Sequence, residues 1–468
     1  MSVVPSASPV LQASPVAAPW AVASLAITML LSSLGTSIAN VGLPTLARAF
    51  GTSFQAVQWV VLAYLLAVTA LVVSAGRLGD LVGRRHLLLA GIGIFTAASI
   101  ACGSVEDLGW LIAARALQGS GAALMMALSM ALVGETVARE RVGSAMGMLG
   151  TMSAVGTALG PSLGGVLIDG FGWRAIFLIN VPLGLLGLAL AYRFLPRDRL
   201  GKQRVVFDFA GSALLTVALI AYALAMTLGR GAFGGVNLAL LGATVLLLGV
   251  FVVVESKSRA PLVQTAFLRN RAVRAGFASS VLATTVAMTT LVIGPFYLSG
   301  ALGLGAAETG MAMAAGPLVA ALVGIPAGRG VDLWGARRMV ILGLAAMALG
   351  SAVLSTVSTA LGVWAYVVPL LVLTAGFATF QAANNTAVLA TADVAQRGVV
   401  SGLLNLSRNL GLITGASAMG AVYAAGSGAI ESATDELSVV SGTHVAFAVA
   451  TGLIAVALLV AMTAQRKP

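Results

Sequence analysis

Two arginines stand inside long apolar stretches of the sequence, where a charged side chain is costly. Arg115 lies in the segment ARALQGSGAA, and Arg408 lies in the segment SRNLGLITG. A cation in the interior of a membrane usually faces a polar cavity or a partner group. Each arginine is therefore either a hydrogen-bonding partner between helices or a contact for a substrate or a coupling ion, and the sequence leaves both alternatives open.

Uncharged polar and aromatic residues recur at helical spacing in other apolar stretches, and they could line a polar passage. A single polar residue in such a stretch more often joins two helices than it contacts a ligand. As a set, however, these residues favour a binding surface shared by several helices. The residues that we predict to form it, together with the two arginines, are Thr36, Asn40, Gln58, Trp59, Tyr64, Phe377, Gln381 and Asn384.

A glycine-rich loop with charged residues occurs twice, about half a chain apart. The first copy reads GRLGDLVGRRHLLL over 76–89, and the second reads GRGVDLWGARRMVIL over 328–342. Glycine permits a tight turn, aspartate can stabilise a helix N-terminus, and the arginines can form ion pairs. One such loop could serve topology alone, but two copies favour a latch that closes in one conformation and opens in another. The predicted latch residues are Gly76, Asp80, Gly83, Arg84, Arg85 and Asp332.

The residues that enzymes use for catalysis do not gather anywhere in the sequence. There is one cysteine, Cys102, and the two histidines, His86 and His444, lie far apart. This composition gives neither a metal-ligand cluster nor a nucleophile–base set. A receptor is also disfavoured, because the longest predicted outer loop, 426–441, is too short for a sensing domain. We therefore expect no enzymatic activity, no metal and no cofactor.

Composition places the chain in a lipid bilayer. Of its 468 residues, 59% are hydrophobic and only 9% are charged, whereas a soluble domain carries roughly a quarter charged residues. This balance excludes a soluble fold, and it excludes disorder because disorder requires low hydrophobicity. The net charge of +11 comes without a compact basic run that contains aromatics. We therefore expect basic loops at a membrane surface and no nucleic-acid partner.

Apolar stretches separated by charges, proline and glycine predict an all-α integral membrane protein with fourteen transmembrane helices. An even number puts both termini on one side. Loops on that side carry most of the 26 basic residues, whereas only Arg48, Arg174 and Arg230 lie on the other, so we predict that the termini are cytoplasmic. The predicted spans are 20–47, 55–78, 86–105, 108–135, 142–168, 173–195, 207–228, 236–255, 274–298, 308–328, 337–357, 361–391, 397–425 and 442–464.

The repeated loop indicates a duplicated six-helix unit. We predict that the two units are separated by two further helices, which are joined to them by charged cytoplasmic linkers. The expected organisation is a flexible tail over 1–19, a first bundle over 20–196, two inserted helices over 197–273 and a second bundle over 274–468.

The fifth predicted span contains a stripe of small residues, and it reads GTMSAVGTALGPSLGG over 150–165. Gly156, Gly160 and Gly164 recur at every fourth position, which lets another helix backbone approach closely. Pro161 should bend the helix and free one backbone carbonyl. Ordinary helix packing would also account for this stripe.

These motifs together resemble the major facilitator superfamily. The first loop matches its signature G-x-L-x-D-x-x-G-R-R/K, ARALQGSGAA is similar to its arginine motif in span 4, and the fifth span resembles its antiporter signature. The segment GWRAIFLINVP over 172–182 is typical of the fourteen-span drug:proton antiporter branch.

The resemblance implies a major facilitator fold, with two six-helix bundles plus two extra helices in a multi-pass cell-membrane protein. It implies export of small organic molecules or drugs by alternating access, with protons as a second partner through antiport. Under this resemblance Arg115 takes part in proton transfer or substrate contact, and the bend in the fifth span seals the passage.

One departure from the branch bears on coupling. Members usually carry an acidic residue just before a stretch that here reads GTSIANVGLP over 35–44, and this chain has Gly35 in the acidic position. All 15 acidic residues fall near the predicted ends of spans or in loops. A carboxylate within the membrane is the usual proton carrier and cation partner. The alternative is therefore an uncoupled or weakly coupled exporter of neutral or anionic metabolites.

Overall fold

The computed structural model describes residues 17–137, 142–198, 209–228, 234–257, 270–391, 397–427 and 436–464. Helices joined by short turns make up these ranges, and no strand occurs within them. An all-helical chain satisfies its backbone hydrogen bonds inside each segment, as a lipid environment demands.

Each of the fourteen predicted spans falls on a helix, with the sixth divided between α6 and α7 at Ile179. The helices before the first linker are α1 Ala17–Ala49, α2 Phe54–Val82, α3 Arg84–Ser104, α4 Leu108–Thr136, α5 Val142–Phe171, α6 Ala175–Leu178 and α7 Asn180–Phe194. The inserted pair is α8 Phe209–Thr227 and α9 Gly235–Lys257. The remaining elements are α10 Arg271–Phe296, the π-helical turn η3 Tyr297–Ala301, α11 Ala306–Trp334, α12 Ala336–Leu354, the 3-10 turn η4 Thr359–Leu361, α13 Trp364–Leu389, α14 Arg397–Gly426 and α15 Glu436–Ala464.

Twelve of the helical segments in the described part of the chain are long and apolar enough to cross a membrane. The two other predicted spans are α8, which has a shorter apolar core at Ala213–Met226, and α14, a 30-residue helix that contains Arg408.

Several predicted boundaries were wrong by three residues or more, and one of them is the end of α11 at Trp334 rather than 328. The last helix begins at Glu436 rather than 442, so the outer loop predicted over 426–441 is shorter than expected. The first helix begins at Ala17, so residues 17–19 of the predicted tail are helical, while 1–16 lie outside the described residues. At the starts of α1 and α15, the helix extends beyond its apolar stretch through segments that include small or polar residues.

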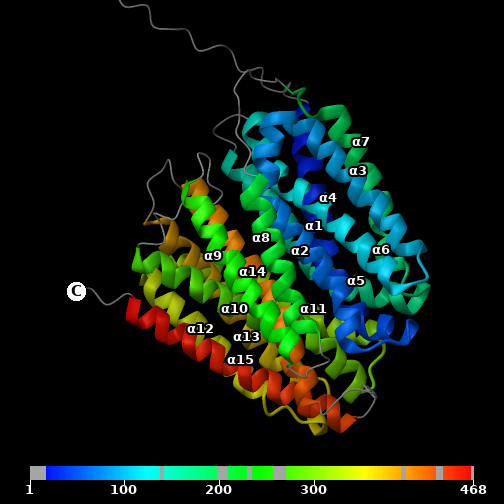
Figure 1. The fold of residues 1–468 in the computed structure, drawn as a ribbon, viewed down its shortest axis with the longest axis vertical. Helices are drawn as coiled ribbons and strands as arrows, with labels where there is room; N and C mark the ends of the chain where they lie inside the picture. The colour runs from blue at the N-terminus through cyan, green and yellow to red at the C-terminus, as the bar shows by residue number, and fades with distance from the viewer. Residues whose placement is uncertain are drawn as a thin grey trace, which may run out of the picture.

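Helices α1 to α7 pack against one another, and so do α10 to α15. Figure 1 shows the early helices in blue and cyan beside the late ones in yellow to red. Helix α8 contacts α2 on one side and α14 on the other, and α9 packs on α8. The predicted division of the chain at 196 and 273 stays a prediction, because the linkers 199–208 and 258–269 lie outside the described residues.

The two glycine-rich turns lie at the same end of the molecule. Gly420, near the end of α14, packs against Gln58, near the start of α2, so the end of α2 lies with the start of α14. The α12–α13 hairpin returns the chain from Gly335 to that same end. We call it the basic end, after the arginines that follow Gly83 and Gly335, and we call the other the opposite end.

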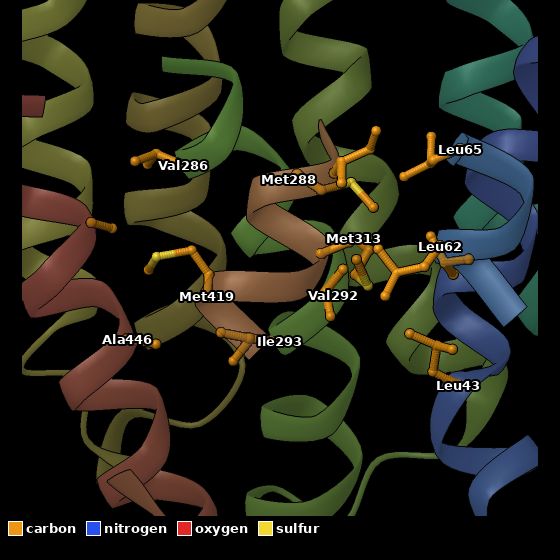
Figure 2. Close-up of a cluster of buried hydrophobic side chains, with 14 of the residues drawn as sticks. Leu43, Leu62, Leu65, Val286, Met288, Val292, Ile293, Met313, Met419 and Ala446 are labelled. Carbon is orange, nitrogen blue, oxygen red and sulfur yellow. The ribbon is translucent and has the colours of Figure 1, made fainter. Parts of the chain in front are cut away.

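The buried apolar residues divide differently at the two ends. One shared core joins both bundles toward the opposite end and continues along the second bundle as far as Val331 and Met339. In Figure 2 Leu62 of α2 lies beside Met313 of α11, and Leu65 lies toward Met288 of α10. Toward the basic end one cluster belongs to the first bundle alone, and a smaller one belongs to the second bundle. Its buried members are Val273, Val388, Val400 and Leu404. The first bundle therefore contributes to the shared core only toward the opposite end, and its buried residues toward the basic end form a cluster of their own.

Candidate functional site

Arg115 is fully buried in the first bundle, in the half that lies toward the opposite end. It lies seven residues after the start of α4. Its Nε donates to the carbonyl of Val60 at 2.9 Å, and its Nη2 donates to the carbonyl of Gly35 at 3.0 Å. Its Nη1 donates to the side chain of Gln118, whose Nε2 donates to Ser99 Oγ at 2.7 Å. The guanidinium thus ties α4 to α1, α2 and α3.

Aromatic rings complete the surroundings of this charge. The guanidinium carbon lies 4.3 Å from the centre of the Tyr64 ring and 5.7 Å from that of Phe177. The Tyr64 hydroxyl donates to the carbonyl of Ser32 at 2.7 Å. Carbonyl dipoles and ring quadrupoles can compensate a cation in place of a carboxylate. Sequence reasoning placed Arg115 and Tyr64 in one set, but it missed Gln118, Ser99 and Phe177 as partners.

The polar residues predicted on α1 make local contacts. Thr36 donates to the carbonyl of Ser32 at 3.1 Å, and Asn40 donates through Nδ2 to the carbonyl of Thr36 at 3.1 Å. Asn40 Oδ1 is buried and has no hydrogen-bond partner among the described residues.

Gln58 of α2 lies where the first bundle contacts the second, at Gly420 of α14. We call this line of contact between the bundles the seam. Its side chain is buried, and within the described ranges neither atom of its carboxamide has a hydrogen-bond partner. A side chain at Gly420 of α14 would overlap this carboxamide. Trp59 and Phe377 are partly buried and pack against the shared core.

The predicted residues of α13 serve helix packing in this conformation. Asn384 is buried, and its Nδ2 donates to the carbonyl of Gly276 in α10 at 3.1 Å. A small cavity beside it is enclosed by the second bundle alone, with a lining that includes Ser279, Val340 and Ala461. Gln381 is partly buried. The structure therefore brings Arg115 and Tyr64 together and distributes the remaining predicted wall residues over both bundles.

Arg408 differs from Arg115 in having no recorded partner. Its Nε is buried without a hydrogen bond, and no ion pair or ring contact to it is found within the described part of the chain. It lies eleven residues into α14, counted from Arg397, which is ~17 Å from that end of the helix.

The first predicted latch turn is held by Asp198, an acidic residue just after α7. Asp198 accepts hydrogen bonds from the backbone N–H groups of Arg85 at 2.8 Å and His86 at 2.9 Å, and it also contacts His86 Nδ1. Gly83 has φ +105°, and its missing side chain makes room for the Asp198 carboxylate. Arg85 Nη2 donates to the carbonyl of Tyr192 at 2.6 Å. Asp198 therefore caps the N-terminus of α3 and fastens the start of the linker to the turn.

The other predicted latch residues lie at helix ends or in the turns between helices. Gly76 and Asp80 lie in the last turns of α2, with the Asp80 side chain outside the described residues, and Arg84 begins α3. In the second copy Gly335 has φ +83°, as a tight turn requires. Asp332 near the end of α11 is exposed. The latch role of both copies stays a prediction.

The glycine stripe of α5 faces α1. Side chains added at Gly156, Gly160 or Gly164 would meet α1 at Leu30, at Ser37 or at Val41 and Ile38. The same helix also meets the second bundle, because the Pro161 carbonyl lies against Gly310 of α11. Asp169 Oδ2 accepts the backbone N–H of Ala307 at 2.9 Å.

Aromatic residues complete this seam at the opposite end. Phe54 of α2 lies with its ring centre 4.6 Å from that of Phe296 and 4.9 Å from that of Tyr423. The rings come from α2, α10 and α14, so both bundles contribute to the closure. No group of three His, Cys, Asp or Glu residues that could hold a metal ion occurs among the described residues.

Comparisons with known proteins agree with this architecture. The model of the Major Facilitator Superfamily matches residues 25–416, with a second match over 275–468. The chain is 29% identical over 401 residues to the riboflavin transporter RibZ of Clostridioides difficile, covering 86% of this chain and 87% of that protein. It is 31% identical over 415 residues to the drug efflux pump JefA of Mycobacterium tuberculosis, covering 86% of this chain and 81% of that protein.

A solved structure shows the same fold. It is the crystal structure of a bacterial homologue of the human lysosomal transporter Spinster, with a TM-score of 0.72 and 14% sequence identity, and the match covers 97% of this chain and 98% of that one.

Proposed function

Because the chain belongs to the Major Facilitator Superfamily, whose members matched here are transporters rather than enzymes, we propose that it exports small organic molecules by alternating access. The observation that carries this proposal is the unequal division of the core. Two bundles whose shared apolar contacts involve the first bundle at one end only can reverse that arrangement around a passage between them.

The basic end is proposed to face the cytoplasm. The turns after Gly83 and Gly335 carry paired arginines, Arg84 and Arg85 in the first copy and Arg337 and Arg338 in the second. Basic residues are retained in cytoplasmic loops of membrane proteins. With this orientation the opposite end is extracellular, and the closed seam of Phe54, Phe296 and Tyr423 makes the conformation inward-facing.

Proton-coupled antiport is the proposed driving mechanism, in keeping with the motif in α5. A second candidate is weakly coupled or uncoupled export of neutral or anionic metabolites. It is favoured by the surroundings of Arg115, whose charge is compensated by carbonyls, Gln118 and aromatic rings without a carboxylate. Two relatives with about the same sequence identity to this chain are a riboflavin transporter and a drug efflux pump. The relatives therefore support a metabolite and a drug equally well as the transported molecule.

Transport by inside-out membrane vesicles tests the proposal. We expect vesicles that contain the protein to accumulate ethidium or riboflavin beyond vesicles without it. If antiport operates, an acidic interior drives the accumulation and nigericin abolishes it. Accumulation that ignores the pH gradient would select the second candidate, and no accumulation of either compound would contradict the proposed export.

A further inference from the structure

The described helices contain two arginines deep within the bundles, and only one of them is satisfied. Arg115 uses three of its nitrogen atoms in hydrogen bonds and lies between two rings. Arg408 makes no hydrogen bond to any residue that the structure describes, and its Nε is enclosed by protein. The residue as a whole is only partly buried, so its charge is partly removed from water without gaining a partner in return.

The side of α14 that carries Arg408 packs against α10. Leu404, Arg408, Gly411 and Gly415 follow helical spacing along one face. Missing side chains at Gly411 and Gly415 let the carbonyls of Val281 and Thr285 approach, since a Cβ there would lie 2.6 Å and 2.5 Å from those oxygens. Leu404 belongs to the small cluster of the second bundle near the basic end. Along α14, Arg408 therefore lies between Leu404 of that cluster and Ile413 of the shared core.

One edge of this face is open. Asn405 lies one turn from Arg408 toward the basic end, and its side chain is exposed. On the helical wheel it falls between the face toward α10 and the face toward α2, which Gly420 marks through its contact with Gln58. Because α2 belongs to the first bundle, this exposed edge of α14 lies on the side toward the first bundle.

The described part of the second bundle places no carboxylate near the middle of a helix, where it could neutralise Arg408. The acidic residues of the second bundle within the described ranges are Glu308, Asp332 and Glu436, and each lies within a turn of a helix end. No ion pair joins any of them to Arg408. Among the described residues of the two bundles, Arg115 and Arg408 are thus cations without a paired carboxylate.

We propose that Arg408 is the anion-binding group of the transport passage, and that the molecules carried bear a carboxylate or another oxyanion. This inference rests on the proposed transport function and specifies its cargo. A planar guanidinium offers two parallel N–H donors to an oxyanion, and such bidentate pairs are among the strong hydrogen bonds of proteins. The bound anion would supply the partner that the protein itself does not.

A pair of dyes isolates the anionic group. Rhodamine 110 has a free carboxylate, whereas rhodamine 123 is its methyl ester with the same ring system. We expect the purified protein in a neutral detergent to bind rhodamine 110 at least about tenfold more tightly in fluorescence polarisation, a preference that corresponds to about 1.4 kcal/mol. Equal binding, preference for the ester or no binding of rhodamine 110 would overturn the inference, and this comparison needs only the wild-type protein.

Variants then assign the preference to Arg408. Arg408→Gln should reduce the ratio between the dyes to about one, while Arg408→Lys should keep part of it because the charge remains. Lys257→Gln is the control, since Lys257 is an exposed cation at the end of the peripheral helix α9. An unchanged ratio in Arg408→Gln would overturn the assignment.

Two further arms separate the cargo from other causes. Repeating the titration in nanodiscs with and without phosphatidylglycerol tests whether a lipid phosphate occupies Arg408. Loss of the rhodamine 110 preference only with the anionic lipid, without any dye transport, would identify a lipid site and overturn the cargo assignment. Vesicles that export rhodamine 123 better than rhodamine 110 would leave the proposed export intact while refuting the anionic cargo.

Discussion

The different surroundings of Arg115 and Arg408 give the two residues different expected roles. Arg115 joins backbone carbonyls of α1 and α2 to a side chain of α4, so its removal leaves several buried acceptors without donors. Unsatisfied buried acceptors cost about 1–3 kcal/mol each. Arg408 makes no recorded hydrogen bond, and its removal leaves no such acceptors.

We therefore predict that Arg115→Ala mainly lowers stability, whereas Arg408→Ala mainly lowers transport. Arg115→Ala should lower the free energy of unfolding by on the order of 3 kcal/mol, and it should depress transport of every substrate. Arg408→Ala should melt close to the wild type while losing transport of anionic substrates. Thermal unfolding in detergent measures the first effect, and vesicle transport measures the second. An unchanged melting temperature in Arg115→Ala would show that its hydrogen bonds are dispensable.

A single carboxylate, Asp198, determines how the start of α3 is held. It accepts two backbone N–H groups that the helix itself cannot satisfy. Asp198→Ala should destabilise the fold by about 1 kcal/mol, as loss of a helix cap does, and should raise hydrogen exchange at the Arg85 and His86 amides. Normal exchange at these amides would mean that the contact is absent in the membrane. Arg197→Ala, at an exposed neighbouring position, is the matched control.

The first latch copy can be tested separately from its cap. Asp80 lies in the last turn of α2. If this loop served topology alone, the charge of Asp80 would not affect the rate of transport. We predict that Asp80→Asn reduces transport severalfold while leaving the amount of folded protein in the membrane unchanged. Quantitative blotting and vesicle transport check the two parts. Full turnover of the variant would restrict this loop to a topological role.

At the scale of helices, glycines occupy positions where two helix backbones approach too closely for a side chain. Gly310 of α11 lies against the Pro161 carbonyl and Gly165 of α5, so an added methyl group would force the closed seam apart. We predict that Gly310→Ala shifts the population toward opening at the opposite end. Gly324→Ala is the control on the same helix, because nothing lies within 4 Å of a Cβ there.

Labelling measures this shift. A cysteine introduced at Phe54, in the seam of aromatic rings, should react with a membrane-impermeant maleimide severalfold faster in Gly310→Ala than in the parent or the control. Native Cys102 is buried and should contribute little background. Equal rates in all three proteins would argue that α5 and α11 do not form the seal.

The positions of the helices could be predicted from sequence because lipid imposes a simple rule on them. Each span needs a long apolar stretch, and charges, proline and glycine end it. The partners of buried polar groups could not be predicted in the same way. The carbonyls of Val60 and Gly35 have no side-chain signature, and Asp198 meets the α3 turn across more than a hundred residues of sequence. The position of Gln58 between the two bundles likewise could not be predicted, because it depends on the packing of α14 against α2.

For the whole molecule, the decisive arrangement is that both glycine-rich turns lie at one end and the closed seam at the other. Cysteines introduced at His86 and Arg338 should therefore react with an impermeant maleimide only in inside-out vesicles, and a cysteine at Leu361 only in intact cells. His86 and Arg338 are exposed at the basic end, and Leu361 is exposed in η4 at the opposite end. Each substitution removes at most one exposed charge, so the basic bias of the loops that sets the topology is kept. Reaction of the 86 and 338 cysteines from different sides of the membrane would contradict the duplicated-bundle architecture, because the two turns could then no longer act as equivalent latches.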